Sequence, residues 1–436
     1  MIEWNSQAET LNRKIEAASP VVFDLLSKRG KAIYFPNEGI LTQGQRAKDK
    51  EINATIGIAY EDNKDPMVLP SVSSGLKIPT KDAFPYAPSQ GLKSLRDKWK
   101  ELMREKNPSL GTKAISTPVV TCALTHGLSM LGYLFVDEGD ELIIADLNWE
   151  NYDLVFINAY GGKIKNFNFF KDNKFDTEAL RRAINEGPVG KKIVLLNFPN
   201  NPSGYTPTRE AGEQILAILT QAAEAGNRLA VILDDAYFGL AFEDDIMKES
   251  LFARLADIHQ NLLAMKVDGI TKEEYAWGFR VGFITYGIKN GTAELYAALE
   301  EKTAGAVRGN ISNAPHLSQS LFLNALKSEN YRKEKDRNAE MIKERYRNVR
   351  KILDAHPEYR EFFQELPFNS GYFMCVQLKN AKAEKVWNVL LEKYSTGVIY
   401  YSEQNLLRIA FSSTPTAQLE KLFNNIYAAC KDCASM

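Results

Sequence analysis

Apolar runs alternate with amphipathic runs between about residues 88 and 290, and this alternation limits the fold more than any other feature of the chain. The runs VVTCAL, ELIIAD, IVLLNF and LAVILDD are apolar on both faces, whereas GLKSLRDKWKELM and EQILAILTQAAEAG carry apolar residues at helical spacing. Strands that are apolar on both faces and alternate with helices predict a mostly parallel, doubly wound α/β sheet covered on each side.

The length and the later part of the sequence predict two domains. The chain has 436 residues, of which 44% are hydrophobic, enough for a large core. After about residue 313 a long charged helical run, NYRKEKDRNAEMIKERYRNVRKILDA, precedes the shorter strands GYFMCVQL, GVIYY and LLRIAF. We therefore expect a large domain over residues 66–312 and a smaller α+β domain built from residues 1–65 and 313–436.

Charge and cysteine content exclude several classes of function. Lys+Arg 54 against Asp+Glu 55 gives a formal charge of -1, so nothing favours nucleic acid or a membrane as a partner. The N-terminus lacks the pattern of a signal peptide. Four scattered cysteines and four scattered histidines predict neither a disulfide framework nor a metal site. We expect a cytoplasmic protein that binds small molecules.

Functional side chains gather at the carboxyl ends of four predicted strands, where ligands bind in open parallel sheets. These are Ala123, Leu124 and Thr125 at the first end, Asn201 at the second, Asp234 and Tyr237 at the third, and Lys272 and Arg280 at the fourth. Taken singly, each is explained by a helix cap, a turn or a surface lysine. Taken together, they offer a phosphate site, amides, a carboxylate, a phenol and an amine.

That set meets the chemical needs of pyridoxal 5′-phosphate. The aldehyde of this cofactor needs a lysine amine, and its ring nitrogen stays protonated when a buried carboxylate pairs with it. Its phosphate favours an arginine and a helix N-terminus, and its flat ring favours an aromatic neighbour. The strand ends therefore predict a pyridoxal-phosphate site without a metal.

Around these residues the sequence resembles the class I/II aminotransferases, which are pyridoxal-phosphate enzymes of the aspartate-aminotransferase fold. The resemblance rests on Gly269-Ile270-Thr271-Lys272 followed by Arg280, on Asn201-Pro202-Ser203-Gly204, on Asp234-Asp235-Ala236-Tyr237, and on a Tyr-x-Pro motif that begins at Tyr86. It spans about residues 80 to 411. The chain departs from the family at Ala123-Leu124, where members often have Ser-Gly or Gly-Ala, and at Gly269, which replaces a common serine.

The resemblance implies a role for each residue. Lys272 would hold the cofactor covalently and move the proton at the substrate α-carbon. Asp234 would pair with the ring nitrogen, whereas Asp235, on the opposite face of the strand, would be an ordinary hydrogen-bond acceptor. The other implied cofactor contacts are Asn201 and Tyr237 at the phenolic oxygen, Trp149 on the ring, Ala123, Leu124, Thr125 and Arg280 at the phosphate, and Tyr86 from a second subunit of a homodimer.

The implied reaction moves an amino group between an α-amino acid and a 2-oxo acid. Arg408 would bind the substrate α-carboxylate as a bidentate pair. Arg308, four residues before Ser312-Asn313, resembles the second arginine of members that use dicarboxylates, which favours aspartate or glutamate; the alternative is a surface arginine in a loop. Trp149 also occurs at this position in members that act on aromatic amino acids.

Two other functions share these motifs. The same fold hosts pyridoxal-phosphate lyases and decarboxylases that act on amino acids, and the lysine and aspartate motifs do not separate them from aminotransferases. A non-catalytic regulator that binds the cofactor is the third alternative. Residues 1–80 show no basic helix-turn-helix pattern, which counts against a DNA-binding regulator.

Overall fold

A seven-stranded sheet forms the centre of the larger lobe in the computed structural model, which describes residues 5–36 and 39–434. In sheet order the strands are β2 (Val119–Thr121), β10 (Gly282–Gly287), β9 (Leu262–Gly269), β8 (Arg228–Asp234), β7 (Lys191–Asn197), β3 (Glu141–Ala145) and β4 (Lys163–Phe167). Neighbours from β9 to β4 are parallel, and β10 runs antiparallel to both of its neighbours. The predicted α/β fold with a mostly parallel sheet is confirmed.

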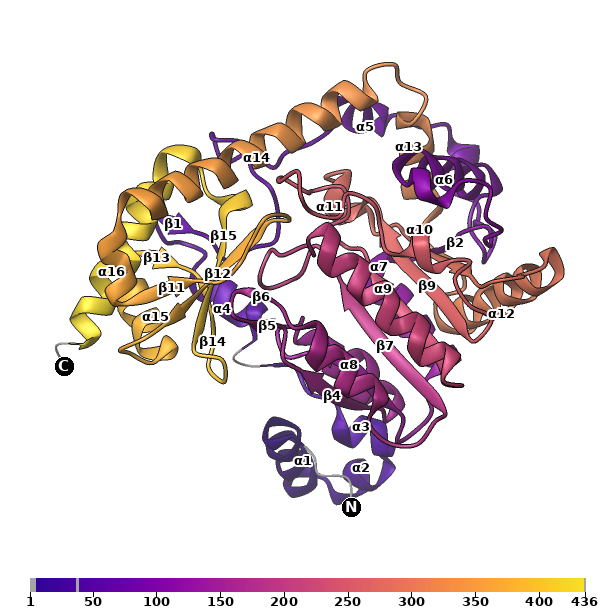
Figure 1. Ribbon diagram of the computed structural model, residues 1–436, viewed down its shortest axis with the longest axis horizontal. Helices are drawn as coiled ribbons and strands as arrows, with labels where there is room; N and C mark the ends of the chain where they lie inside the picture. The colour runs from indigo at the N-terminus through magenta and orange to yellow at the C-terminus, as the bar shows by residue number, and fades with distance from the viewer. Residues whose placement is uncertain (1–4, 37–38, 435–436) are drawn as a thin grey trace.

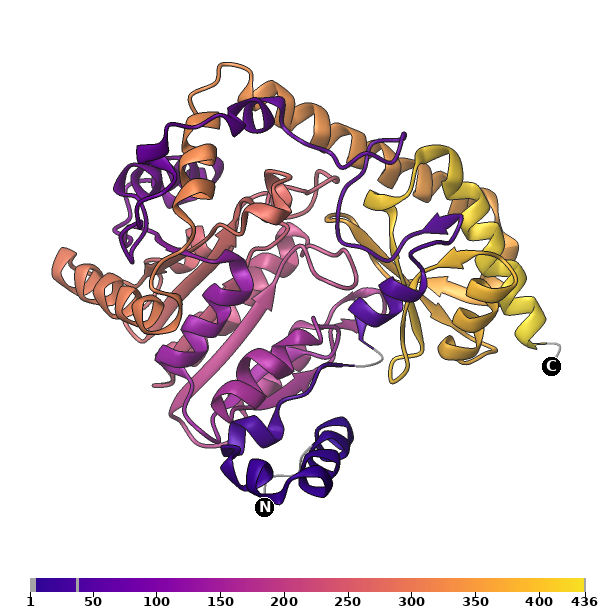
Figure 2. The same ribbon diagram turned by 180° about the vertical axis from the view of Figure 1, so that it is seen from behind.

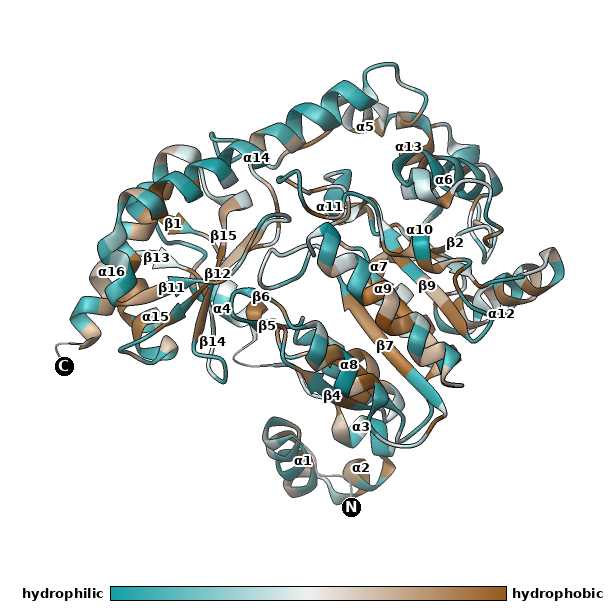
Figure 3. Ribbon diagram, viewed as in Figure 1, coloured by the Kyte–Doolittle hydropathy of each residue, from teal (hydrophilic) through white to brown (hydrophobic). Residues whose placement is uncertain are grey.

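Helices cover both faces of this sheet. Helices α8 (Thr177–Asn185) and α9 (Arg209–Glu224) lie in front of it in Figure 1, and α7 (Ala123–Phe135) lies on the opposite face, seen in Figure 2. Because both faces are covered, the central part of β7 is apolar, as Figure 3 shows, and its first residues, Lys191 and Lys192, are hydrophilic. The other helices of the larger lobe are α5 (Pro70–Ser73), α6 (Lys93–Lys106), α10 (Phe252–Leu255), α11 (Ile270–Glu273), α12 (Ala293–Ile311) and α13 (His316–Ala325).

The smaller lobe is built on an antiparallel sheet of four strands. In order these are β11 (Phe363–Glu365), β12 (Phe373–Leu378), β15 (Leu406–Ala410) and β14 (Ile399–Tyr401), with α15 (Ala383–Glu392) and α16 (Leu419–Ala434) as its main helices. An N-terminal segment joins this lobe, since β1 (Ile52–Asn53) pairs in parallel with β13 (Thr396–Gly397), and α4 (Ile40–Arg46) precedes it. The predicted smaller α+β unit is thus present.

Helix α14 (Tyr331–Ala355) runs from the larger lobe to the smaller one (Figure 1). It is formed by the charged run noted in the sequence. Its exposed side is hydrophilic in Figure 3, while Ile342, Tyr346, Val349 and Leu353 are buried at the spacing of one helix face. One continuous helix therefore contacts both lobes.

The first helices of the chain lie against the larger lobe. These are α1 (Ser6–Ala18), α2 (Pro20–Leu25) and α3 (Lys28–Ala32), and the Arg29 guanidinium lies 5.9 Å from the centre of the Tyr160 ring. The boundaries at residues 65/66 and 312/313 stay a prediction. No helix in the described part of the chain is long and apolar enough to cross a bilayer.

Candidate active site

A cavity of about 200 Å³ lies where the ends of the central strands meet the smaller lobe. Eight residues predicted from the sequence line it: Leu124, Thr125, Trp149, Asn201, Asp234, Tyr237, Lys272 and Arg408. They come from the first turn of α7, from the end of β8, from the segments that follow β3, β7, β8 and β9, and from β15. The parallel sheet accounts for most of this grouping, because its strands all end at one edge.

Asp234 ends β8 inside this cavity. Its Oδ2 accepts a 2.7 Å hydrogen bond from the Tyr152 hydroxyl, and its Oδ1 accepts one of 3.1 Å from the Ala236 amide. Burial raises the pKa of the Asp234 carboxyl, although Tyr152 and Lys272 act to lower it. Within the described residues, no cationic side chain lies within 4.0 Å of this carboxylate. The site therefore holds a buried carboxylate that forms no close ion pair with a described residue.

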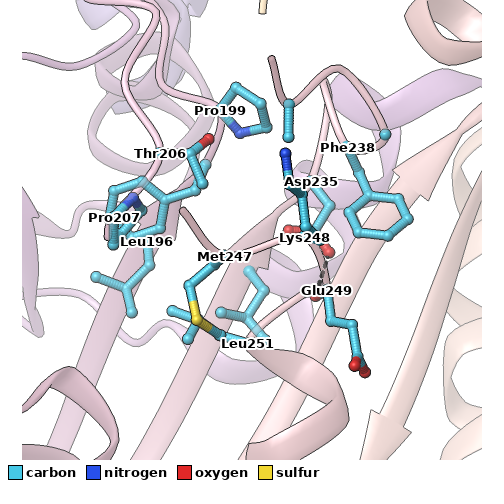
Figure 4. Close-up of a pocket in the computed structure, with 15 residues that line it drawn as sticks. Leu196, Pro199, Thr206, Pro207, Asp235, Phe238, Met247, Lys248, Glu249 and Leu251 are labelled. Atoms are coloured by element: carbon cyan, nitrogen blue, oxygen red, sulfur yellow. Dashed lines mark hydrogen bonds between the residues drawn. The ribbon is translucent and has the colours of Figure 1, made fainter. Parts of the chain in front are cut away.

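Asp235, in contrast, has its own cation. Lys266 Nζ lies 2.6 Å from Asp235 Oδ2 and 2.8 Å from Asp268 Oδ2, and the Ser250 hydroxyl donates to Asp235 over 2.5 Å. Asp235 lines a separate pocket of about 20 Å³ (Figure 4). That volume holds a water molecule and excludes a cofactor. The strand thus divides the two carboxylates between two environments, as its alternation predicts.

Lys272 follows β9 in the short helix α11. Its Nζ lies 5.1 Å from the centre of the Tyr237 ring. Burial lowers the pKa of the Lys272 amine to about 8, with Asp234 opposing this effect and Arg280 adding to it. Gly269, three positions before Lys272, has no room for a side chain, since a Cβ there would lie 2.6 Å from the Val281 carbonyl oxygen. A side chain at this position would therefore collide with the backbone of the neighbouring strand β10 and the residue before it.

Arg408 and Tyr237 close the cavity on the side of the smaller lobe. Arg408 Nη1 donates to Asn201 Oδ1 over 3.0 Å, and its Nη2 donates to the Thr55 carbonyl over 2.8 Å. Its buried Nε makes no hydrogen bond to any residue that the structure describes. Burial raises the pKa of the Tyr237 hydroxyl, which therefore stays a proton donor. Arg408 therefore presents a guanidinium with a fixed orientation at the wall of the cavity.

The start of α7 lies at another wall of the cavity. Leu124 and Thr125 line it, whereas Ala123 is buried behind them with a φ of +60°. The first N–H groups of an α-helix have no partner within the helix and attract anions. This wall has the features of a phosphate site. Thr125 offers one side-chain hydroxyl, whereas Ala123 and Leu124 offer none.

Besides the buried Ala123, three residues predicted from the sequence do not line the cavity of their own chain. Arg280 is exposed and its Nη1 donates to the Trp277 carbonyl over 3.3 Å. Tyr86 is 89% exposed, and Arg308 is exposed near the end of α12. Their assigned roles stay predictions.

The structure adds residues that the motifs did not identify. The further lining residues are Ile40, Gly57, Tyr152, Asn197, Ala236 and Phe373. Asn197 ends β7 directly beside Asp234 and donates to the Asp234 carbonyl over 2.8 Å, so its place at a strand end was a usable signal. Tyr152 lies 82 positions before Asp234 in a segment without a motif, and no sequence signal marks it.

Comparison with known proteins points to one family. The family model "Aminotransferase class I and II" matches residues 59–426. The chain is 24% identical over 379 residues to the mitochondrial aspartate aminotransferase of Schizosaccharomyces pombe, which covers 84% of this chain and 82% of that protein. It is 27% identical over 353 residues to the (5-formylfuran-3-yl)methyl phosphate transaminase of Methanocaldococcus jannaschii, with 79% and 83% covered. The crystal structure of an aminotransferase from Anaerococcus prevotii has the same fold, with a TM-score of 0.80, 23% identity, and 93% of this chain and 98% of that chain covered.

Proposed function

Because the chain belongs to the class I and II aminotransferases, we propose that its pyridoxal-phosphate-dependent amino-group transfer takes place in the cavity around Lys272 and Asp234. One observation carries this proposal. A buried amine with a lowered pKa and a buried carboxylate that forms no close ion pair with a described residue line the same cavity. Strongly shifted groups that face a shared cavity are typical of catalytic sites.

The residues present fit pyridoxal phosphate. The Asp234 carboxylate would pair with a protonated ring nitrogen, and the Tyr152 hydroxyl, which donates to Asp234 Oδ2, would keep that carboxylate in place. Leu124 and Thr125 at the start of α7 would bind the phosphate. When bound, the cofactor supplies an electrophilic carbon for an amine and a conjugated ring that accepts electrons from the substrate α-carbon.

Lys272 acts as the tether and then as the base. With a pKa of about 8, a useful fraction of the Lys272 amine is unprotonated near neutral pH, so it can take a proton from the substrate α-carbon and return it at a neighbouring carbon. Tyr237, kept protonated by burial, and the Asn201 amide donate hydrogen bonds at the phenolic oxygen. Trp149 packs edge-to-face on Tyr152 with ring centres 5.6 Å apart, which orients its ring beside the cavity.

Arg408 binds the α-carboxylate of the amino acid and of the oxo acid. Two of its donors are held by Asn201 and Thr55, and its guanidinium lies 4.2 Å from the centre of the Phe373 ring. These contacts fix the plane of the guanidinium before a substrate arrives. The guanidinium of Arg408 lines the cavity and would form the bidentate pair with the α-carboxylate.

The active unit is a homodimer. Tyr86 and Phe84 are 89% and 84% exposed, and their loop is joined to the end of α12 because the Ser89 hydroxyl donates to the Ser312 carbonyl over 2.9 Å. Tyr86 and Arg308 therefore belong to one exposed surface, and neither lines the cavity of its own chain. A second copy placed on this surface would receive both side chains at its own site.

The substrates are a dicarboxylic amino acid and a 2-oxo acid. This choice rests on Arg308, which a partner subunit would direct at the distal carboxylate, and on the aspartate aminotransferase from S. pombe among the relatives. An aromatic amino acid is the second candidate because Trp149 offers an aromatic wall. The four free cysteines are consistent with a reducing cytoplasm, where we place the enzyme.

Turnover of aspartate, tyrosine and alanine with 2-oxoglutarate tests this choice. We expect aspartate to have the highest kcat/KM. Arg308→Ala should lower kcat/KM for aspartate by about 10- to 100-fold, since a charged hydrogen-bond pair is lost, and should leave alanine within about threefold. Equal losses for both substrates, or a preference for alanine, would show that Arg308 does not select the side chain.

A further inference from the structure

Two consecutive buried acids follow Lys272. Glu273 and Glu274 are only 5% and 1% exposed, although the segment lies next to the cavity. Burial of a charged carboxylate is strongly unfavourable unless a cation and hydrogen bonds compensate it. The identity of the compensating groups therefore shows what holds this segment in place.

Lys335 compensates both acids. Its Nζ lies 2.5 Å from Glu273 Oε1 and 2.8 Å from Glu274 Oε1. Lys106 Nζ lies 2.8 Å from the other oxygen of Glu273, and the Tyr331 hydroxyl donates to Glu274 Oε2 over 2.5 Å. Two carboxylates thus face two ammonium groups. Burial alone would raise the pKa of Glu273, but Lys106 and Lys335 outweigh it and hold the pKa at about 2.

The main cation belongs to the helix that connects the lobes. Lys335 and Tyr331 lie in the first two turns of α14, close to the larger lobe (Figure 1). Farther along α14, the buried Arg345 donates from Nη1 to the Ser412 carbonyl of the smaller lobe over 2.6 Å. The acids after Lys272 are therefore attached to a helix whose other half is fixed to the smaller lobe.

A second contact reaches Lys272 from the smaller lobe. The Tyr372 hydroxyl, just before β12, donates to the Lys272 carbonyl over 2.8 Å. The Glu273 side chain also packs directly against Gly239, because a Cβ at that glycine would lie only 2.6 Å from Glu273 Oε1. The backbone of Lys272 is thus held from α14 on one side and from the smaller lobe on another.

We propose that Glu273, Glu274 and Lys335 form a positioning unit that fixes the Lys272 amine for proton transfer. None of these three side chains lines the cavity, so the unit acts through the backbone of the residue that precedes it. The inference rests on the proposed role of Lys272 and adds residues that lie outside the motifs identified in the sequence. A displacement of about 1 Å at a reacting group can lower a rate by about 100-fold, so a small movement of this segment has a large effect.

The first test compares Lys335→Met with Lys333→Met in the holoenzyme. Both substitutions remove an ammonium group from α14, but Lys333 is exposed, whereas Lys335 contacts the two acids. We expect Lys335→Met to keep the absorbance of the lysine-bound cofactor, to lower kcat by about 10- to 100-fold, and to leave KM within about threefold. Lys333→Met should leave kcat within about twofold, and Lys335→Arg should recover most of the lost rate.

A second measurement separates positioning from a general loss of structure. In a Lys272→Ala background, a small external amine such as methylamine serves as the base for α-proton exchange. If Lys335 acts through Lys272, Lys335→Met should not change this amine-dependent rate. An equal loss in both backgrounds would overturn the proposal, as would a Lys335→Met enzyme that unfolds at a lower temperature with an unchanged kcat.

A charge-balanced variant covers the case in which Lys335→Met does not fold. Glu274→Gln with Lys335→Met leaves Glu273 paired with Lys106 and leaves no buried charge alone. The same fall in kcat with a near-constant KM is expected, and an unchanged kcat would overturn the proposal. Full turnover by Lys272→Ala alone would instead refute the proposed role of Lys272, whatever the Lys335 variants do.

Discussion

Lys266 Nζ lies 2.6 Å from Asp235 Oδ2, whereas the neighbouring Asp234 has no cation within 4.0 Å among the described residues. The two carboxylates follow each other in the sequence and leave β8 on opposite faces. Asp235 is already paired with Lys266 inside the protein, whereas Asp234 faces the cavity. This difference supports the proposal that Asp234, rather than Asp235, pairs with the ring nitrogen of the cofactor.

Replacement by asparagine should therefore affect catalysis at Asp234 and stability at Asp235. Asp234→Asn should lower kcat by at least about 100-fold with the fold intact, because the ring nitrogen of the cofactor loses its countercharge. Asp235→Asn should leave kcat within about threefold and lower the free energy of unfolding by about 1–3 kcal/mol, because Lys266 and Ser250 lose a buried partner. Steady-state kinetics and urea unfolding measure both effects. The reverse pattern would assign the ring nitrogen to Asp235.

The lowered pKa of Lys272 predicts how the apoenzyme takes up its cofactor. Only the neutral amine is a nucleophile, and its fraction rises with pH up to the pKa of about 8. Between pH 6.5 and pH 8 the rate of covalent capture should increase by up to about tenfold per pH unit, and it should level off above pH 8. Stopped-flow absorbance measures this rate, and Lys272→Ala is the control without capture. A rate that still rises almost tenfold between pH 8 and pH 9 would mean that the amine has the pKa of an exposed lysine, about 10.4.

Arg408→Lys should separate substrate binding from cofactor binding. Lysine cannot reproduce the planar fork that holds Asn201 and Thr55 and still offers a donor to the substrate. We expect KM for the amino acid to rise by about 10- to 100-fold while the bound cofactor keeps its absorbance. An unchanged KM would indicate that a different group binds the α-carboxylate.

Tyr372→Phe examines the hydrogen bond to the Lys272 carbonyl. The substitution removes one hydroxyl and keeps the ring, which packs edge-to-face on Tyr237 with ring centres 5.3 Å apart. We expect kcat to fall by about 3- to 10-fold, in line with the loss of a single hydrogen bond, and cofactor content to stay constant. Loss of the cofactor itself would show that Tyr372 supports the Tyr237 side of the site rather than Lys272.

The sequence predicted the part of the site that local motifs and sheet geometry determine. Asn201, Asp234 and Lys272 follow parallel strands, and such strands end at one edge of the sheet, so their grouping needs no knowledge of distant contacts. The apolar character of β7 and β8 likewise follows from burial on both faces.

The remainder depends on how distant segments pack. Ile40, Gly57 and Phe373 reach the cavity only because the smaller lobe and the N-terminal segment lie against the sheet. Lys335 and Glu273 are 62 positions apart, and no periodic pattern in the sequence indicates that they pair. The sequence around Lys335 predicts only a long charged helix. The side chains of Tyr86 and Arg308 are exposed in a single chain, so their proposed roles depend on a second copy of the chain.

The most direct test of the account is the half-reaction of the holoenzyme with aspartate alone. The account predicts that the absorbance of the lysine-bound cofactor is replaced by that of the amine form, with one oxo acid released per site, and that 2-oxoglutarate restores the first spectrum. Lys272→Ala should show no such cycle. Release of ammonia without the amine form would contradict the account and indicate a lyase, and a full cycle in Lys272→Ala would contradict the role of Lys272.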